Sequence, residues 1–484
     1  MTVVFSGNSY KYEVEAIVKL FLPARSFSFI FEAVDAPDDI CVVRYKAGKC
    51  FAYHYAYVRL NGQKYRLAAK LPLAEADGSI TERTLCRLLY LCLQKVTGLT
   101  PAWGMLTGIR PVKRVNRMLD EGKSCAQIEE ELRRDFLVTP EKIRLACRTA
   151  ETQRPLLQIP ERSFSLYVSI PFCPTRCSYC SFVSHSVESA QKRMPEYIKK
   201  LTEEIRLTAQ LAERLSLSLD TVYIGGGTPT SLEAAQLEQV MQAVNREFNL
   251  SALREYTVEA GRADTITSEK LEVIRRNGAT RISVNPQTMN DAVLRAIGRN
   301  HTAQQVREAY KAARDAGFDN VNMDLIAGLP ADDVESFSRT LDEILALAPE
   351  NVTVHTLSLK RSSSLFQEKG EVASDPAEIM VALAQERLLA GGYSPYYLYR
   401  QKNTLSNQEN VGYAKPGLES LYNVFIMEEV QTILAVGAAG STKLVDAKTG
   451  QIRRIFNYKF PYEYIDRFDL LMEKKKEIID FFKE

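Results

Sequence analysis

The chain has 484 residues, 45% of them hydrophobic, and its 62 basic residues nearly balance its 60 acidic ones, giving a formal net charge of +2. This length predicts several domains with buried cores, and the charge balance gives no global attraction to nucleic acid or to a membrane surface. No apolar run reaches the length of a membrane span, and the first residues lack a secretion signal, so we expect a cytoplasmic protein that binds no nucleic acid.

Residues 1–100 are predicted to form an α+β module. The dipeptide Asn61-Gly62 lies between two alternating runs and predicts a tight β-hairpin, because both turn positions need positive φ. An apolar stripe predicts a helix over Thr81–Val96. The strands expected in this module are Phe27–Glu32, Ile40–Tyr45, Phe51–Leu60 and Lys64–Leu71.

The sequence pattern changes at residues 101–160, which are interpreted as a helical linker region. Ser124 and Thr139 are expected to cap two of its helices. The arginines of this region raise the alternative of a helix-turn-helix, but arginine scattered over helix faces is more typical of solvation than of a phosphate-binding surface. The expected helices are Lys113–Glu121, Cys125–Asp135 and Pro140–Gln153.

Residues 161–371 alternate between strand and helix, which predicts a parallel sheet with right-handed crossovers, closed or partly closed as a barrel. A barrel places its active site at the carboxyl ends of its strands. The expected strands are Leu166–Ile170, Thr221–Ile224, Glu255–Glu259, Arg281–Asn285, Asn320–Leu325 and Asn351–Leu357. The expected helices are Pro195–Leu215, Ala234–Phe248, Ser268–Asn277, Ala303–Ala316 and Val334–Leu347.

Residues 372–484 are interpreted as a C-terminal region that covers the substrate. It is expected to contain helices at Ala377–Leu389 and Pro461–Phe482, separated by a tyrosine-rich stretch, Tyr393–Arg400. These tyrosines either form a flat apolar wall for a macrocycle or pack as ordinary strand residues, and the sequence leaves both alternatives open.

Cys173, Cys177 and Cys180 form a Cys-x3-Cys-x2-Cys run directly after a predicted strand. Three thiolates on one loop can ligate three irons of a 4Fe-4S cluster and leave the fourth iron open. S-adenosylmethionine (SAM) can chelate an open iron, and an electron from the cluster then cleaves its C–S bond to a carbon radical. The spacing is the radical SAM signature.

Two other roles for these cysteines fit less well. Structural zinc takes four nitrogen or sulfur ligands, usually from paired half-sites, and the nearby fourth candidate is His185. Disulfides are unexpected in a chain with nine cysteines and no secretion signal.

Polar or flexible residues follow several predicted strands. The glycines 225–227 let a ligand approach the backbone, and exposed carbonyls there can take an ammonium group. Glu259 can bind a sugar hydroxyl or an amino group, although an ion pair with Arg262 is the alternative. Gln287 offers both a donor and an acceptor.

Two further candidates are charged. Arg299 can bind a carboxylate through two parallel hydrogen bonds. Asp324 lies in an otherwise apolar strand, which is unfavourable unless it meets a ligand or partner. His185, His301 and His355 fall in the same region, but each is more typical of a structural residue.

Together these motifs resemble the oxygen-independent coproporphyrinogen III oxidase family, and the whole chain resembles its coproporphyrinogen dehydrogenase HemZ branch. The resemblance implies a radical SAM partial (β/α)6 barrel with an N-terminal α+β domain and a C-terminal α/β accessory region. Its motifs are Tyr-x-x-Ile-Pro-Phe-Cys at 167–173, Gly-Gly-Gly-Thr-Pro-Thr at 225–230, Glu259, Gln287, Ile-Gly-Arg at 297–299 and Met-Asp-Leu-Ile-Ala-Gly-Leu-Pro at 323–330.

The resemblance also implies residue roles. Cys173, Cys177 and Cys180 would hold the 4Fe-4S cluster. Tyr167 would stack beside the cluster, Tyr179 would lie against adenine, and Tyr167 and Asp324 are the residues expected at the reacting groups. The methionine group would be taken by Gly226, Gly227 and Thr228. The contacts to one or other of two SAM molecules would come from Glu259, Gln287, Arg299, Asp324 and Ser358.

The implied reaction belongs to porphyrin and haem biosynthesis. A hydrogen atom is removed from the β-carbon of each of two substrate propionates, and carbon dioxide and an electron are lost, which leaves the two vinyl groups of protoporphyrinogen IX. The implied partners are a porphyrinogen or haem-like small molecule and an electron donor such as flavodoxin or ferredoxin.

Three features separate branches of the family. The oxidases carry a fourth cysteine where this chain has Phe182, and their His-Ile-Pro is here Ser169-Ile170-Pro171. The Cys-x-Phe ending is shared with a haem-chaperone branch, but that branch has a C-terminal motif ending in tryptophan, and Trp103 is the single tryptophan of this chain. The alternatives are therefore a haem-binding trafficking protein and a radical SAM enzyme acting on haem or another substrate.

Overall fold

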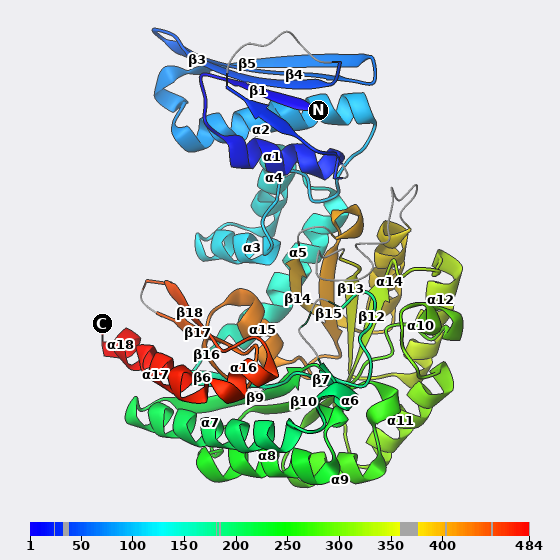
Figure 1. Cartoon of the computed structure of the whole chain (residues 1–484). Coiled ribbons are helices and arrows are strands. Elements are labelled where there is room, and N and C mark those ends of the chain that lie inside the picture. Colours follow the sequence, from blue (N-terminus) through cyan, green and yellow to red (C-terminus); the bar gives the residue numbers. More distant parts are fainter. Residues whose placement is uncertain are drawn as a thin grey trace. The chain divides into compact units, whose positions relative to one another are not determined.

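The computed structural model describes residues 1–23, 25–31, 38–180, 182, 185–358, 376–401, 404–446 and 449–483 (Figure 1). The chain divides into two compact units. The first consists of Met1–Cys147 with Arg400–Asn407, and the second consists of Arg148–Tyr399 with Gln408–Glu484.

The N-terminal unit is built on a five-stranded sheet. Its strands are β1 (Thr2–Ser6), β2 (Ser28–Ile30), β3 (Ile40–Ala47), β4 (Phe51–Leu60) and β5 (Gln63–Pro72). Their order is β2-β1-β3-β4-β5, with β1 parallel to β2 and β3 and the other pairs antiparallel. Asn61 and Gly62 have φ of 50° and 79° and form the predicted hairpin turn. The predicted strand at Phe27–Glu32 reaches Glu32, which lies outside the described residues.

Two helices, α1 (Lys11–Phe21) and α2 (Gly78–Thr97), cover one face of this sheet (Figure 1). The side chain of Asp77 caps α2 by accepting a hydrogen bond from Ile80 N at 2.7 Å. The predicted apolar stripe of α2 is buried, namely Leu85, Leu88, Leu89, Cys92 and Leu93. The sequence interpretation missed β1 and α1, although α1 buries a helix-period stripe, Val14, Ile17, Val18 and Phe21.

Three helices follow, α3 (Pro111–Asp120), α4 (Cys125–Phe136) and α5 (Pro140–Gln153), as predicted. Ser124 and Gln127 form a capping box at the start of α4. Residues 400–407 also belong to this unit, because Arg400 N donates to Ile109 O at 2.7 Å.

The second unit contains the predicted partial (β/α)6 barrel. Its six parallel strands are β6 (Ser163–Ile170), β9 (Ser218–Gly226), β10 (Glu255–Gly261), β11 (Arg281–Val284), β12 (Val321–Ala327) and β13 (Asn351–Thr356). The helices between them are α7 (Met194–Arg214), α8 (Ala234–Glu247), α9 (Ser268–Arg276), α10 (Asp291–Ala296), α11 (Ala303–Asp315) and α12 (Val334–Leu347). All five predicted barrel helices and all six strands are confirmed within a few residues.

Further strands extend this sheet at both ends. The full order is β14-β15-β13-β12-β11-β10-β9-β6-β16-β17-β18. The added strands are β14 (Ser394–Arg400), β15 (Glu409–Ala414), β16 (Thr432–Val436), β17 (Ser441–Val445) and β18 (Ile452–Phe456). The later helices are α14 (Ala377–Ala390), α15 (Leu421–Glu428), α16 (Pro461–Asp466), α17 (Phe468–Lys475) and α18 (Glu477–Lys483). Among the described helices, none is long and apolar enough to cross a bilayer. The predicted boundary at 371/372 lies outside the described residues.

The prediction of one helix over Pro461–Phe482 is wrong, because the chain breaks into α16, α17 and α18. Tyr464 OH donates to Glu204 Oε2 at 2.6 Å, and Lys475 Nζ lies 2.6 Å from Glu204 Oε1. In a continuous helix these two residues would be about 16 Å apart along the axis. The break at Arg467, where φ is −116°, lets both reach one buried carboxylate.

Two of the three tyrosines of β14 are packed inside the unit, which supports the second of the two alternatives for them, and Tyr399 is partly exposed. Tyr396 and Tyr397 are buried, and their rings make an edge-on contact. Gly412 lies against the Tyr397 ring so closely that a Cβ would fall 1.9 Å from it. That contact gives the glycine at position 412 a structural explanation.

Candidate active site

The three cysteines lie on one loop after β6. Cys173 ends β7 (Phe172–Cys173), which pairs with β8 (His185–Ser186), and Cys180 N donates to Cys177 O at 3.1 Å. Burial raises the pKa of the Cys180 thiol, a hydrogen bond from the Phe182 backbone opposes this, and Cys177 and Cys173 raise it further. The three sulfurs are therefore close enough for a negative charge on one to disfavour a charge on the others, and a bound cation would reverse that effect.

The Ile-Gly-Arg motif that follows α10 lies directly against this loop. Ser178 N donates to Ile297 O, and Thr175 Oγ1 donates to Gly298 O, both at 3.1 Å. Gly298 has φ of 75°, a conformation that favours glycine. The motif thus holds the cysteine loop from outside the barrel strands.

Arg262, just after β10, holds the same loop from a second side. It is only 2% exposed, and its Nη1 donates to Thr175 Oγ1 at 2.7 Å. Its other nitrogens bond the Asp264 carboxylate at 2.9 and 2.7 Å. The alternative ion pair between Glu259 and Arg262 is therefore wrong, since the guanidinium points to Asp264 and Thr175.

Asp264 joins this contact to a buried histidine. His301 Nδ1 lies 3.5 Å from Asp264 Oδ1. Burial tends to raise the pKa of Asp264, but its interactions with His301 and Arg262 hold it below its ordinary value. The carboxylate is therefore ionised at neutral pH and fixes the orientation of the Arg262 guanidinium.

The glycine run ends β9 directly beneath the cysteine loop. A Cβ on Gly227 would fall 2.6 Å from Phe172 O, and Gly226 has φ of 112°. Thr228 N donates to Phe172 O at 2.7 Å, and Thr228 Oγ1 lies 3.4 Å from Cys173 Sγ. Only glycine permits this close approach of the two backbones.

Glu259 is the carboxyl group next to the glycine run. Tyr223 OH donates a hydrogen bond to its Oε1. Burial raises the pKa of Glu259 to about 7, the Tyr223 hydrogen bond opposes this, and the charge of Asp324 raises it further. At neutral pH this carboxyl group is divided between its protonated and ionised forms.

The pKa of Asp324, on β12, is shifted in the opposite direction to that of Glu259. Asn322 Nδ2 donates to its Oδ1 at 2.8 Å, and His355 Nε2 lies 3.9 Å from its Oδ2. Burial would raise the pKa of Asp324, but the interactions with His355, Asn322 and Thr353 lower it below its ordinary value. The barrel therefore presents one ionised carboxylate and one that titrates near neutrality, the arrangement expected of a functional pair.

Gln287 and Arg299 reach the same carboxyl end of the barrel. Gln287 has φ of 69°, and its N donates to Asp324 O at 2.8 Å. Arg299 Nη1 donates to Asn285 O at 2.6 Å, and its Nη2 lies 3.2 Å from Tyr179 OH. Within the described part of the chain, Gln287 Oε1 and Arg299 Nε are buried without a hydrogen-bond partner.

The remaining predicted site residues lie nearby in the fold. The Tyr167 ring stacks on Tyr223 and Tyr422, with centroid separations of 6.2 Å in each case. Ser358 follows β13 and is partly exposed. The roles suggested for Tyr167, Tyr179 and Ser358 stay predictions.

Sequence reasoning missed Tyr223 and Asn322, which bond the two carboxyl groups. Strand alternation was the available signal, because Tyr223 precedes Gly225 by two residues and Asn322 precedes Asp324 by two. Residues two apart on a strand point to the same face.

The residues present fit a 4Fe-4S cluster and SAM. Three thiols share one loop, and the glycine run admits backbone contacts that a Cβ would prevent. Buried polar atoms are normally satisfied, so Gln287 Oε1 and Arg299 Nε require partners. The ribose hydroxyls and the carboxylate of SAM have the matching chemistry.

The Radical SAM superfamily profile matches residues 167–344, which include the cysteine loop and most of the barrel. Fold and site thus define a radical SAM protein, of the class that uses a 4Fe-4S cluster and SAM. The chain is 42% identical over 410 residues to the oxygen-independent coproporphyrinogen-III oxidase-like protein HemZ of Bacillus subtilis, covering 82% of this chain and 81% of that protein. It belongs to the oxygen-independent coproporphyrinogen III oxidase family, as the sequence motifs predicted.

Haem chaperones are also relatives. The chain is 32% identical to HemW of Bacillus subtilis, with 54% of this chain and 66% of that protein covered. It is 30% identical to HemW of Lactococcus lactis, with 63% and 75% covered. The solved structure of Escherichia coli coproporphyrinogen III oxidase HemN superposes with a TM-score of 0.51 at 24% identity, covering 67% of this chain and 73% of that one, and supports the fold.

Proposed function

We propose that the protein is an oxygen-independent coproporphyrinogen III dehydrogenase that converts two propionates to vinyl groups. The observation that carries this proposal is the extent of the match to HemZ. The range Arg148–Glu484 makes up less than 82% of the chain. A match over 82% of the chain therefore necessarily includes part of the first 147 residues. Each of the two HemW matches covers a share of the chain that is small enough to lie within the second unit.

When bound, the cluster and SAM supply a carbon radical that removes a hydrogen atom from the β-carbon of a substrate propionate. Loss of carbon dioxide, and of one electron to an acceptor, then leaves the vinyl group. Within this account, Cys173, Cys177 and Cys180 hold the cluster, and a one-electron donor such as flavodoxin or ferredoxin reduces it.

The side chains of the barrel orient SAM. Gly226, Gly227 and Thr228 expose backbone groups to its methionine part. Arg299 and Gln287 bring donors and an acceptor that the surrounding described residues leave unsatisfied. Asp324 supplies a fixed negative charge, and Glu259 ionises when a positive group such as the SAM ammonium lies beside it, because an opposite charge lowers a carboxyl pKa.

An anaerobic turnover tests this proposal. The reconstituted protein is given reductant, SAM and coproporphyrinogen III, and mass spectrometry follows the porphyrins and 5′-deoxyadenosine. We expect the divinyl product with the wild type and none with Cys177→Ala. If 5′-deoxyadenosine forms while the tetracarboxylic porphyrin is unchanged, the substrate assignment is wrong and another substrate, such as haem, must be tried.

One observation favours a second function, haem binding without decarboxylation. Phe182 stands two residues after the third cysteine and is 64% exposed, and the haem chaperones are relatives of this chain. Stoichiometric haem binding by the purified protein, with no porphyrin product in the turnover assay, would establish this function instead.

A further inference from the structure

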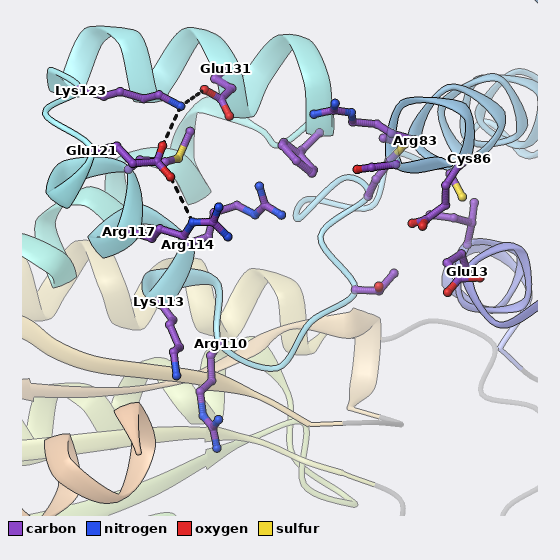
Figure 2. Close-up of a pocket in the computed structure, with 17 residues that line it drawn as sticks. Glu13, Arg83, Cys86, Arg110, Lys113, Arg114, Arg117, Glu121, Lys123 and Glu131 are labelled. Carbon is purple, nitrogen blue, oxygen red and sulfur yellow. Dashed lines mark hydrogen bonds and ion pairs between the residues drawn. The ribbon is translucent and has the colours of Figure 1, made fainter. Parts of the chain in front are cut away.

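A cavity of about 710 Å³ lies within the N-terminal unit (Figure 2). Its walls come from α1 and α2 on one side and from α3, α4 and the chain before α3 on the other. This volume lies in the range of roughly 300–1,000 Å³ found for small-molecule sites. The family motifs all lie in the other unit, so none of them accounts for this cavity.

Basic side chains outnumber acidic ones around the cavity. The basic residues are Arg83, Arg110, Lys113, Arg114, Arg117 and Lys123, and the acidic ones are Glu13, Glu82, Glu121 and Glu131. Two of the acids are already paired on the α3–α4 side. Arg117 Nε donates to Glu121 at 3.1 Å, and Lys123 Nζ lies 2.7 Å from Glu131 and 3.3 Å from Glu121.

Two guanidinium groups converge on the cavity without such partners. Figure 2 shows Arg83 and Arg114 pointing into the open space from α2 and α3. Among the described residues, neither forms an ion pair with an acidic side chain. Desolvation lowers the pKa of Arg114, Glu131 opposes this, and Arg117 and Arg83 lower it further. Converging like charges in a concave site are unfavourable until an anion binds between them.

Most of the remaining lining is apolar, with Ser79 and Thr107 as the polar exceptions. The buried apolar residues are Ile17, Cys86, Met105, Met118 and Phe136. The Arg114 guanidinium lies 4.2 Å from the centroid of the Phe136 ring, so charge and aromatic surface already meet here. Burial and the nearby Glu13 raise the pKa of Glu82, and the charge of Arg83 opposes this.

We propose that this cavity binds an anionic tetrapyrrole, with Arg83 and Arg114 holding carboxylates of its propionate groups and the apolar residues contacting its ring. The choice of a tetrapyrrole rests on the proposed function. The N-terminal unit would then be a substrate-holding or product-holding site, separate from the cysteine loop. The match to HemZ, which reaches into this unit, is consistent with a role specific to that branch.

Trp103 gives a direct readout, because it is the single tryptophan of the chain and is buried in the N-terminal unit. The full chain is titrated with coproporphyrin III, the stable oxidised tetracarboxylate, and quenching of Trp103 fluorescence reports binding. We expect Arg83→Gln and Arg114→Gln each to weaken binding about tenfold, the effect of one lost charged hydrogen bond.

Arg87→Gln is the matched control. Arg87 is exposed on α2, one turn from Arg83, and does not line the cavity, so its variant should bind as the wild type does. Unchanged affinity in both cavity variants overturns the proposal. Displacement of the porphyrin by an equimolar amount of inorganic phosphate also overturns it, because the cavity would then be a general anion site.

The same titration in the Cys177→Ala background separates this inference from the proposed function. That chain lacks a cluster ligand and should not turn over, yet it retains the cavity. Arginine-dependent porphyrin binding there supports the cavity site even if the wild type shows no decarboxylation. If the wild type decarboxylates its substrate while the cavity variants bind porphyrin normally, the inference alone is wrong.

Discussion

Nη1 of Arg262 lies 2.7 Å from Oγ1 of Thr175, so the end of β10 is bonded to the middle of the cysteine loop. The same nitrogen also donates to Thr175 O at 3.2 Å. Because Arg262 is buried and also bonded to Asp264, the loop is held in place by the protein itself. A ligand loop that is preorganised in this way loses less conformational entropy when it binds its cluster.

Arg262→Gln is therefore expected to reduce the iron bound per chain after reconstitution. The variant removes a buried guanidinium and leaves Asp264, whose side chain is 18% exposed, without its arginine, so the free energy of unfolding should also fall by about 1–3 kcal/mol. Iron analysis and urea unfolding measure the two effects. Arg276→Gln is the control, because its pair with Glu238 is half-exposed and should contribute less than about 1 kcal/mol. Full iron content in Arg262→Gln would contradict a positioning role.

The raised pKa of Glu259 predicts a pH dependence of stability. Between about pH 4.5, the ordinary pKa, and about pH 7 the unfolded chain has lost this proton while the folded chain keeps it. The free energy of unfolding should therefore fall as pH rises through this window, by up to about 3 kcal/mol, and stay low above it.

Glu259→Gln isolates this contribution, because glutamine does not titrate. Unfolding of the cofactor-free wild type and of the variant is compared at pH 5 and pH 7.5, and the wild type should lose more stability between them. Tyr223→Phe removes a hydrogen bond that lowers the Glu259 pKa, so its pH step should move upward. Parallel profiles for all three chains would show that Glu259 has an ordinary pKa.

Gly227→Ala should disrupt the contact between the glycine run and the cysteine loop. Its Cβ would meet Phe172 O at 2.6 Å, so β7 has to move. We expect SAM binding, measured by calorimetry on the reconstituted protein, to weaken by tenfold or more, about 1.4 kcal/mol. Gly108→Ala is a suitable control, since nothing lies within 4 Å of a Cβ there. Equal SAM affinity in the two variants would remove the glycine run from the site.

Lys475→Met tests the anchor of the C-terminal helices. Lys475 Nζ and Glu204 Oε1 are 2.6 Å apart, and the Glu204 side chain is fully buried. Removing the lysine leaves a buried carboxylate without its counter-charge, and urea unfolding should show a loss of about 3–5 kcal/mol. The double variant with Glu204→Gln should recover part of this loss. A single variant as stable as the wild type would contradict this anchoring role.

The sequence predicted the barrel well, because buried parallel strands and amphipathic helices alternate with a clear period. It predicted the cysteine loop and the glycine run from their spacing. It did not predict that Arg262 bonds Thr175 instead of Glu259, because 87 residues separate the two partners and only the folded barrel brings them together. The break at Arg467 was missed for the same reason, since Glu204, the residue that requires it, belongs to α7.

The most direct test of the account follows one atom from substrate to cofactor. Coproporphyrinogen III carrying deuterium on the β-carbons of its propionates is incubated anaerobically with the reconstituted protein, reductant and SAM, and 5′-deoxyadenosine is analysed by mass spectrometry. We predict deuterium in 5′-deoxyadenosine together with a divinyl product. Unlabelled 5′-deoxyadenosine beside an unchanged tetracarboxylic substrate would contradict it.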